Sequence, residues 1–102
     1  MTSDIYMRVE IKKATQKNKK LQAIFYDDKG KKIKTIPFGQ AGASDFTQHR
    51  DLERMKRYDD RHKPREDWNN PMTAGALSKI ILWSKPTLKE GIADFKKRFN
   101  FN

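Results

Sequence analysis

Residues 21–30 read LQAIFYDDKG, and this stretch decides the fold that the sequence predicts. Leu21, Ala23 and Phe25 occupy every second position, which is the two-residue period of a strand with one buried face. Residues 27–30 then form a strong turn signal, because Asp tolerates turn geometry and Gly supplies a positive φ. A strand that ends in such a turn predicts a hairpin, with a second strand after the turn.

Strands are predicted on both sides of residues 21–26. Upstream, Ile5, Met7, Val9 and Ile11 alternate with polar or aromatic neighbours, and downstream a weaker strand spans residues 32–38. Pro37 confines the end of that strand to a sheet edge or a strand exit, because proline donates no ladder hydrogen bond. Since short connections favour pairing of consecutive strands, residues 1–38 predict a three-stranded antiparallel meander.

Helical spacing of apolar residues begins after residues 39–43, which we interpret as a connector. Three helices are predicted, over residues 44–63, 71–84 and 87–100. Their predicted start signals are Ser44 as N-cap, Asn70 followed by Pro71, and a capping box of Thr87 and Glu90.

The expected architecture is therefore α+β, with a three-stranded antiparallel meander followed by three helices packed on one face, in a single domain over residues 1–102. The residues expected in the core are Val9, Ile11, Phe25, Leu77, Ile81, Ile92 and Phe95.

The composition narrows the functional classes. The 102 residues include 23 Lys and Arg against 13 Asp and Glu, which gives a net charge of +10 and predicts an anionic partner. The absence of Cys excludes disulfides, Cys-ligated zinc and thiol catalysis. No apolar run is long enough to span a membrane, and residues 1–4 do not begin a signal peptide. We expect an intracellular or virion protein that is neither secreted nor bound to a membrane.

Lysines near the two hairpin turns are the main candidates for phosphate contact, because a mobile point charge suits sequence-independent binding. The candidate nucleic-acid-binding residues are Lys17, Lys19, Lys20, Lys29, Lys31, Lys32, Arg50 and Arg54. We expect the lysines to be exposed turn residues. Their alternative role is to keep edge strands soluble and to prevent edge pairing.

The predicted first helix carries a stripe of arginines, and two interpretations of their role are possible. Pairs such as Glu53 with Arg57 favour a solvated, self-paired face, whereas Arg50 and Arg54 are the better candidates for phosphate. Gly42 and Ser44, which precede this helix, form a possible anion site at its N-terminus. They match neither the P-loop nor the Rossmann fingerprint, and small residues also serve a tight crossing from sheet to helix.

The two histidines do not indicate a metal site. His49 and His62 lie thirteen positions apart on one predicted helix, which is too far to share a metal ion. His62, together with Arg61, Arg65 and Glu66, is a candidate general base for a small nuclease. Capping or packing at a helix end is the alternative role. We expect no enzyme activity, no cofactor and no metal.

The two tryptophans have different expected roles. Trp83 lies in the most apolar predicted helix and is expected in the core. Trp68 lies in a polar stretch and is expected to hold that loop against the domain, with stacking on a base as the alternative.

Several runs of residues resemble a known family. The runs are Phe38-Gly39-x-x-Gly42-x-Ser44-Asp45-Phe46-Thr47-x-His49-x-Asp51, Arg57-Tyr58-x-x-Arg61-His62-x-x-Arg65-Glu66-x-Trp68, Thr73-Ala74-Gly75-x-Leu77-Ser78, Leu82-Trp83 and Pro86-Thr87-Leu88. They are similar to a family of small uncharacterised proteins encoded by large nucleo-cytoplasmic DNA viruses, including chlorella-virus and mimivirus relatives. The resemblance implies a viral origin but no activity. It marks residues 39–68 as a signature region, with roles unknown for His49, Asp51, Arg61, His62 and Trp68.

Three functional hypotheses follow. The first is a small basic viral accessory or virion protein that binds DNA or RNA, or another polyanion, non-specifically through Lys and Arg surfaces. The second is an interaction protein that docks acidic protein surfaces, including viral structural proteins. The third is a small nuclease-like enzyme that uses His49 or His62.

Overall fold

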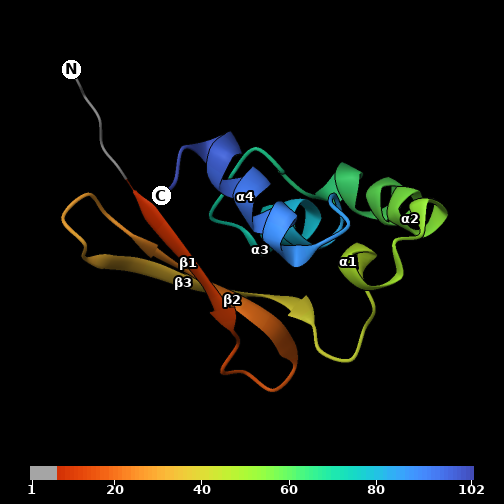
Figure 1. Ribbon diagram of the computed structural model, residues 1–102, viewed down its shortest axis with the longest axis horizontal. Helices are drawn as coiled ribbons and strands as arrows, with labels where there is room; N and C mark the ends of the chain where they lie inside the picture. The colour runs from red at the N-terminus through yellow and green to blue at the C-terminus, as the bar shows by residue number, and fades with distance from the viewer. Residues whose placement is uncertain (1–6) are drawn as a thin grey trace.

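The computed structural model describes residues 7–102 and shows an α+β fold, with an antiparallel sheet followed by helices (Figure 1). The sheet has the order β1-β2-β3, as the meander predicted from sequence requires. Its strands are β1 (Arg8–Lys13), β2 (Lys19–Tyr26) and β3 (Lys32–Gln40). Ile5, which was expected to begin the first strand, lies outside the described residues.

One face of the sheet is apolar because the strand register places hydrophobic residues side by side. Val9 lies opposite Phe25, and Ala23 lies between Ile11 and Ile36. The free edge of β1 is covered by the last two residues of the described chain. The Val9 N–H donates to the Asn102 carbonyl (3.2 Å), the Asn102 N–H donates to the Met7 carbonyl (2.9 Å), and Met7 forms a parallel bridge with Phe101.

The helical half begins where β3 ends. Its elements are α1 (Phe46–His49), α2 (Leu52–His62), the 3₁₀ turn η1 (Lys63–Arg65), α3 (Ala74–Leu77), the π-helical turn η2 (Ser78–Leu82) and α4 (Leu88–Phe99). In Figure 1, α3 and α4 cover one face of the sheet, while α1 and α2 lie beyond the end at which β3 finishes.

The core forms between the apolar sheet face and the α3, η2 and α4 segment. Of the expected core residues, Val9, Phe25, Leu77, Ile81 and Phe95 are at most 1% exposed. The other two, Ile11 and Ile92, are partly buried against the same cluster. The two halves of the sequence therefore share one hydrophobic core. Trp83, expected in that core, lies at its border and is only partly buried.

The helix predicted over residues 44–63 is two helices. Arg50 has a left-handed backbone (φ 53°) and ends α1, and Asp51 then caps α2 by accepting from the N–H groups of Glu53 and Arg54. The cap of α1 is Asp45 rather than Ser44. A carboxylate at each of these positions binds the free N–H groups of a new helix start, which overrides the continuous helical spacing. His49 and His62 therefore belong to different helices.

The other helix starts also differ in part from the prediction. The Asn70 side chain accepts from the Met72 N–H and so forms a turn, and Thr73 caps α3 instead. Thr87 caps α4 as predicted, with its hydroxyl accepting from the Glu90 N–H (3.2 Å). The reciprocal bond from the Glu90 side chain is not formed within the described residues, and Glu90 is exposed.

Candidate functional site

A groove of about 880 Å³ separates the end of the sheet from α2 and α3. Its walls come from the start of β2, the end of β3, the β3–α1 connection, α2, η1, α3 and η2. The charged side chains in the lining are the cations Lys19, Lys20, Arg54, Arg61 and Arg65 and the carboxylates Asp45 and Glu66, with His62 beside them. The excess of cations makes this groove the candidate site for an anionic ligand.

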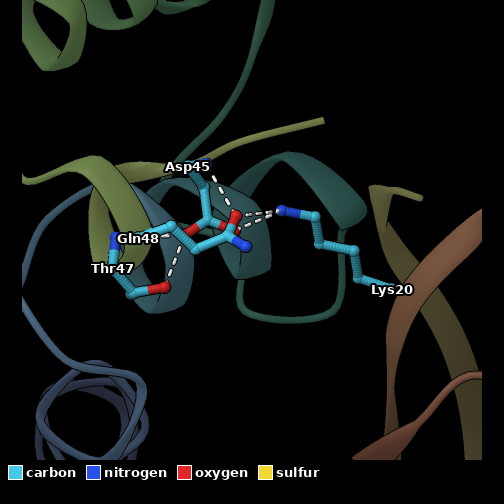
Figure 2. A network of polar contacts seen from close by, with 4 residues as sticks. All are labelled: Lys20, Asp45, Thr47 and Gln48. Carbon is cyan, nitrogen blue, oxygen red and sulfur yellow. Dashed lines mark hydrogen bonds and ion pairs between the residues drawn. The ribbon is translucent and has the colours of Figure 1, made fainter. Parts of the chain in front are cut away.

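Lys20 and Asp45 form one wall, and each neutralises the other. The Lys20 ammonium lies 2.5 Å from Asp45 Oδ2 and 3.0 Å from the Gln48 amide oxygen (Figure 2). Asp45 is 3% exposed, and its second oxygen accepts from the Thr47 N–H (3.0 Å). Lys20 thus links the sheet to α1. Both Lys19 and Lys20 are half-buried residues of β2 rather than the exposed turn residues expected from the sequence. Asp45 also already binds the start of α1, so nothing observed at Gly42 and Ser44 favours a further anion there.

The α2 side of the groove carries guanidinium groups that have no ion-pair partner among residues 7–102. These are Arg54, Arg61 and Arg65, all of which are exposed. Arg57 instead faces Glu53 at 3.9 Å in the i,i+4 pair that the sequence indicated, but both side chains are highly exposed, so the pair adds little stability. Arg50 uses its Nε to donate to the Pro86 carbonyl (2.9 Å). Of the two arginines proposed for phosphate contact, Arg54 faces the groove and Arg50 fastens α1 to the segment before α4.

His62 is held in place by Glu66, which is held in turn by Trp68. His62 Nδ1 lies 3.2 Å from Glu66 Oε2, and Trp68 Nε1 donates to Glu66 Oε1 (2.8 Å). Because an ionised carboxylate only accepts, His62 Nδ1 is the donor in this contact. Glu66 also lies directly over Gly75, where a Cβ would come within 2.9 Å of its carboxyl carbon. The sequence grouped His62 with Glu66, and the structure brings them together.

Trp68 holds its loop as the sequence predicted. Besides its bond to Glu66, its ring lies under the Lys79 ammonium, at 5.2 Å from the ring centroid. Lys79 is itself paired with Asp59 of α2 at 2.7 Å. The loop after η1 is therefore fastened to both α2 and η2.

A column of stacked rings runs from the groove into the protein. His62 stacks on Tyr58 (centroids 4.1 Å apart, 22° between planes), and Tyr58 stacks on Trp83 (4.4 Å, 8°). Trp83 in turn contacts His49 (5.3 Å, 55°), and His49 forms a T-shaped pair with Phe46 (6.2 Å, 79°). Burial raises the pKa of the Tyr58 hydroxyl, and the negative charge of Glu66 raises it further.

The sequence did not predict this column as a unit. The i,i+4 spacing of Tyr58 and His62 was visible, and it places both rings on one helix face. The contact between Tyr58 and Trp83 joins α2 to the residue after η2, and no local pattern indicates such a contact. Tyr58 is therefore a groove residue that the sequence marked only as part of the run resembling the viral family.

The lysines proposed for nucleic-acid contact are divided between two ends of the sheet. Lys29, Lys31 and Lys32 lie at the β2–β3 turn, at the end away from α1 (Figure 1). Lys17 lies in the β1–β2 turn, which is tied to the β3–α1 connection by a bond from the Ala41 N–H to the Asn18 carbonyl (3.1 Å). Only Lys19 and Lys20 line the groove. The proposed lysines do not form one continuous surface.

Within residues 7–102, no three His, Asp or Glu side chains gather in a way that would hold a metal ion. In the same part of the chain, no helix has the length and apolar composition needed to cross a membrane.

Comparison with known proteins identifies one family. Residues 9–62 match the model of a family described only as a family of unknown function, DUF5754. No curated protein sequence and no solved structure matches the chain significantly. The matched segment includes the sheet, α1 and α2, and with them Arg54, Arg61 and His62, whereas Glu66, Trp68 and Trp83 lie beyond it. Because the match covers more than half of the chain, the protein belongs to the family of unknown function DUF5754.

Proposed function

We propose that this protein binds nucleic acid without sequence preference and that the phosphates lie in the groove beside α2. The observation that carries the proposal is that Arg54, Arg61 and Arg65 line this groove with no ion-pair partner among the described residues. Like charges that share a recess repel one another, which costs folding free energy. An anionic ligand that neutralises them removes this cost, so the arrangement favours binding.

The groove suits phosphate better than the distal β2–β3 turn does. A guanidinium presents several N–H groups in a planar fork that matches two phosphate oxygens, whereas a Lys ammonium acts as a point charge. A recess also reduces screening by water and salt relative to an exposed turn. We therefore assign the main contacts to the three arginines and Lys19, and a weaker, diffuse attraction to Lys29, Lys31 and Lys32.

The biological setting that we propose is that of a small accessory or virion protein of a large DNA virus. Its support is the resemblance carried by residues 38–51 and 57–68. That signature region includes Arg61, His62 and Arg65 of the groove, so the residues that suggest the setting also supply part of the proposed binding surface.

The test compares two triple variants that remove the same charge. Arg54→Gln, Arg61→Gln and Arg65→Gln together change the groove, and Lys29→Gln, Lys31→Gln and Lys32→Gln change the distal turn. Binding of a labelled oligonucleotide is measured by fluorescence anisotropy at several salt concentrations. We expect the groove variant to lose most of the affinity and its slope of log K against log salt to flatten by about 0.7–0.9 for each lost phosphate contact. The turn variant should change both quantities much less.

Two results would contradict the proposal. Equal losses in the two variants would mean that total charge, and not the groove, determines binding. The absence of any salt-sensitive binding by the unmodified protein would exclude the nucleic-acid function altogether, and pull-down on acidic protein surfaces would then be the next measurement.

A further inference from the structure

We infer that the groove takes single-stranded nucleic acid, with one base stacked on the imidazole of His62. This inference rests on the proposed function and specifies the form of the ligand. It is carried by the position of His62 at the open end of the ring column and by the unpaired arginines in the same groove.

His62 is the ring at the groove end of the column and has a face left for a ligand. Tyr58, which is buried, stacks on both His62 and Trp83, and the partly buried Trp83 contacts Tyr58 and the tilted ring of His49. The far end is closed by Phe46 against His49. Among residues 7–102, ring contacts cover only the Tyr58 side of His62, and the His62 side chain is 38% exposed and lines the groove. A base placed there would continue the column by one ring.

The His62 ring is fixed before any ligand arrives. Tyr58 determines the plane of the imidazole, and Glu66 holds its Nδ1 edge at 3.2 Å. Glu66 is fixed by the Trp68 indole at 2.8 Å and by its position over Gly75. A ring that is already ordered loses little conformational entropy when a base stacks on it, which improves binding.

The surrounding charges match the backbone on both sides of such a base. Arg61 precedes His62 directly and Arg65 follows it by one helical turn, and both line the groove without an ion-pair partner in the described chain. Aromatic platforms beside cationic grooves are the usual means of binding single strands without reading their sequence. In a duplex each base is already stacked on its neighbours and paired, so a duplex cannot offer a free face without losing that energy.

The experiment uses three probes of equal length: a single strand with bases, an abasic single strand and a duplex. Each is titrated with the unmodified protein, with His62→Ala and with His62→Phe, which keeps an aromatic ring. We expect the unmodified protein to bind the strand with bases about tenfold more tightly than the abasic strand. His62→Ala should bring this ratio close to one. His62→Phe should keep most of the ratio. The distal turn variant of Lys29, Lys31 and Lys32, titrated as a control, should keep all of it because it retains His62.

An NMR readout separates stacking from a general loss of stability. The carbon-bound ring protons of His62 should shift upfield when the strand with bases is added, and should shift much less with the abasic strand. Thermal unfolding of both His62 variants shows whether they are folded, and the Phe variant keeps the test decisive if the Ala variant is not.

The outcomes distinguish this inference from the function on which it rests. Equal affinity for the two single strands, an unchanged ratio in a folded His62→Ala, or tighter binding of the duplex would overturn the stacking. In those cases, a loss of affinity in the Arg54, Arg61 and Arg65 variant would still support phosphate binding in the groove. If no probe binds in a salt-sensitive manner, both proposals fail.

Discussion

Lys19 and Lys20 are neighbours in β2, but their side chains have different surroundings. The Lys20 ammonium is paired with Asp45, and the two side chains are 19% and 4% exposed. Lys19 has no ion pair within the described residues and lines the groove. The same residue type therefore stabilises the fold at one position and is available to a ligand at the next.

Replacing Lys20 should destabilise the protein, because Asp45 would keep a buried charge that has lost its cationic partner. We expect Lys20→Gln to lower the unfolding free energy by about 1–3 kcal/mol. The cost stays within this range because Asp45 keeps its bonds from Thr47. Lys19→Gln should change it by less than about 0.5 kcal/mol. Urea unfolding of the two variants measures both values, and equal costs would show that the Lys20–Asp45 pair adds no stability.

Tyr58 makes the stability depend on alkaline pH. Its folded-state pKa is raised above the ordinary value of 10.0, first by burial and then by the charge of Glu66, so the folded protein favours the neutral phenol. The contribution of the neutral Tyr58 hydroxyl to the unfolding free energy is complete below pH 10. It is lost as the pH rises from 10 toward the folded-state pKa. Tyr58→Phe has no hydroxyl to ionise, so it does not lose this stability. The unfolding free energy of Tyr58→Phe minus that of the unmodified protein should therefore be larger above pH 10 than at neutral pH.

The difference between these two proteins, measured by urea unfolding across the pH range, isolates Tyr58 from the lysines that titrate in the same region. A difference that stays constant with pH would mean that the Tyr58 hydroxyl ionises equally easily in the folded and unfolded chains.

Among the elements, α4 and η2 meet at a backbone contact that only glycine permits. A Cβ on Gly91 would overlap the carbonyl oxygen of Ile81, and Gly91 is buried in this contact. Helix propensity alone favours Ala over Gly by about 1 kcal/mol. The close approach of α4 to η2 instead favours Gly at position 91, because it leaves no room for a Cβ.

We expect the close approach to dominate, so Gly91→Ala should destabilise the protein by about 1–3 kcal/mol. Lys89→Ala, at an exposed position of the same helix, is the control and should change stability by less than about 0.5 kcal/mol. Thermal unfolding compares them. A Gly91→Ala variant that is more stable than the unmodified protein would mean that α4 moves away from η2 at little cost.

The accuracy of the sequence prediction differs between elements for identifiable reasons. The strands and the turn at residues 27–30 follow from local patterns, and the structure has them. The helix over residues 44–63 was predicted as continuous because apolar spacing continues across Arg50, whereas the caps at Asp45 and Asp51 divide it. His62 and Glu66 were grouped only as members of a candidate nuclease site, and the structure places them 3.2 Å apart. The groove could not be predicted, because it joins β2 to α2 and depends on tertiary packing.

Across the whole molecule, the core depends on aromatic residues from distant parts of the chain. Phe101 is 8% exposed and lies against Phe25 of β2 (5.3 Å between ring centroids) and Phe95 of α4 (5.9 Å). It therefore links the sheet to the last helix, in addition to bringing its neighbour Asn102 to the edge of β1.

Phe101→Ala should cost about 3–5 kcal/mol, because it leaves a cavity between these rings and releases the residues that cover β1. Leu52→Ala removes a large apolar side chain that is 67% exposed, so it should have little effect. Urea unfolding gives both values. A cost for Phe101→Ala as small as that for Leu52→Ala would show that the end of the chain is not part of the core.

Residues 101 and 102, which cover the outer edge of β1, are made long after β1 during protein synthesis. The ribosome makes β1 early and residues 101 and 102 last among the described residues, so the outer edge of β1 has no partner while the intervening chain emerges. An open edge is a template for pairing with another chain. The nascent protein is therefore prone to association until residues 101 and 102 have left the exit tunnel and cover this edge. A stalled chain that stops before residue 101 should aggregate more readily than one that includes residues 101 and 102.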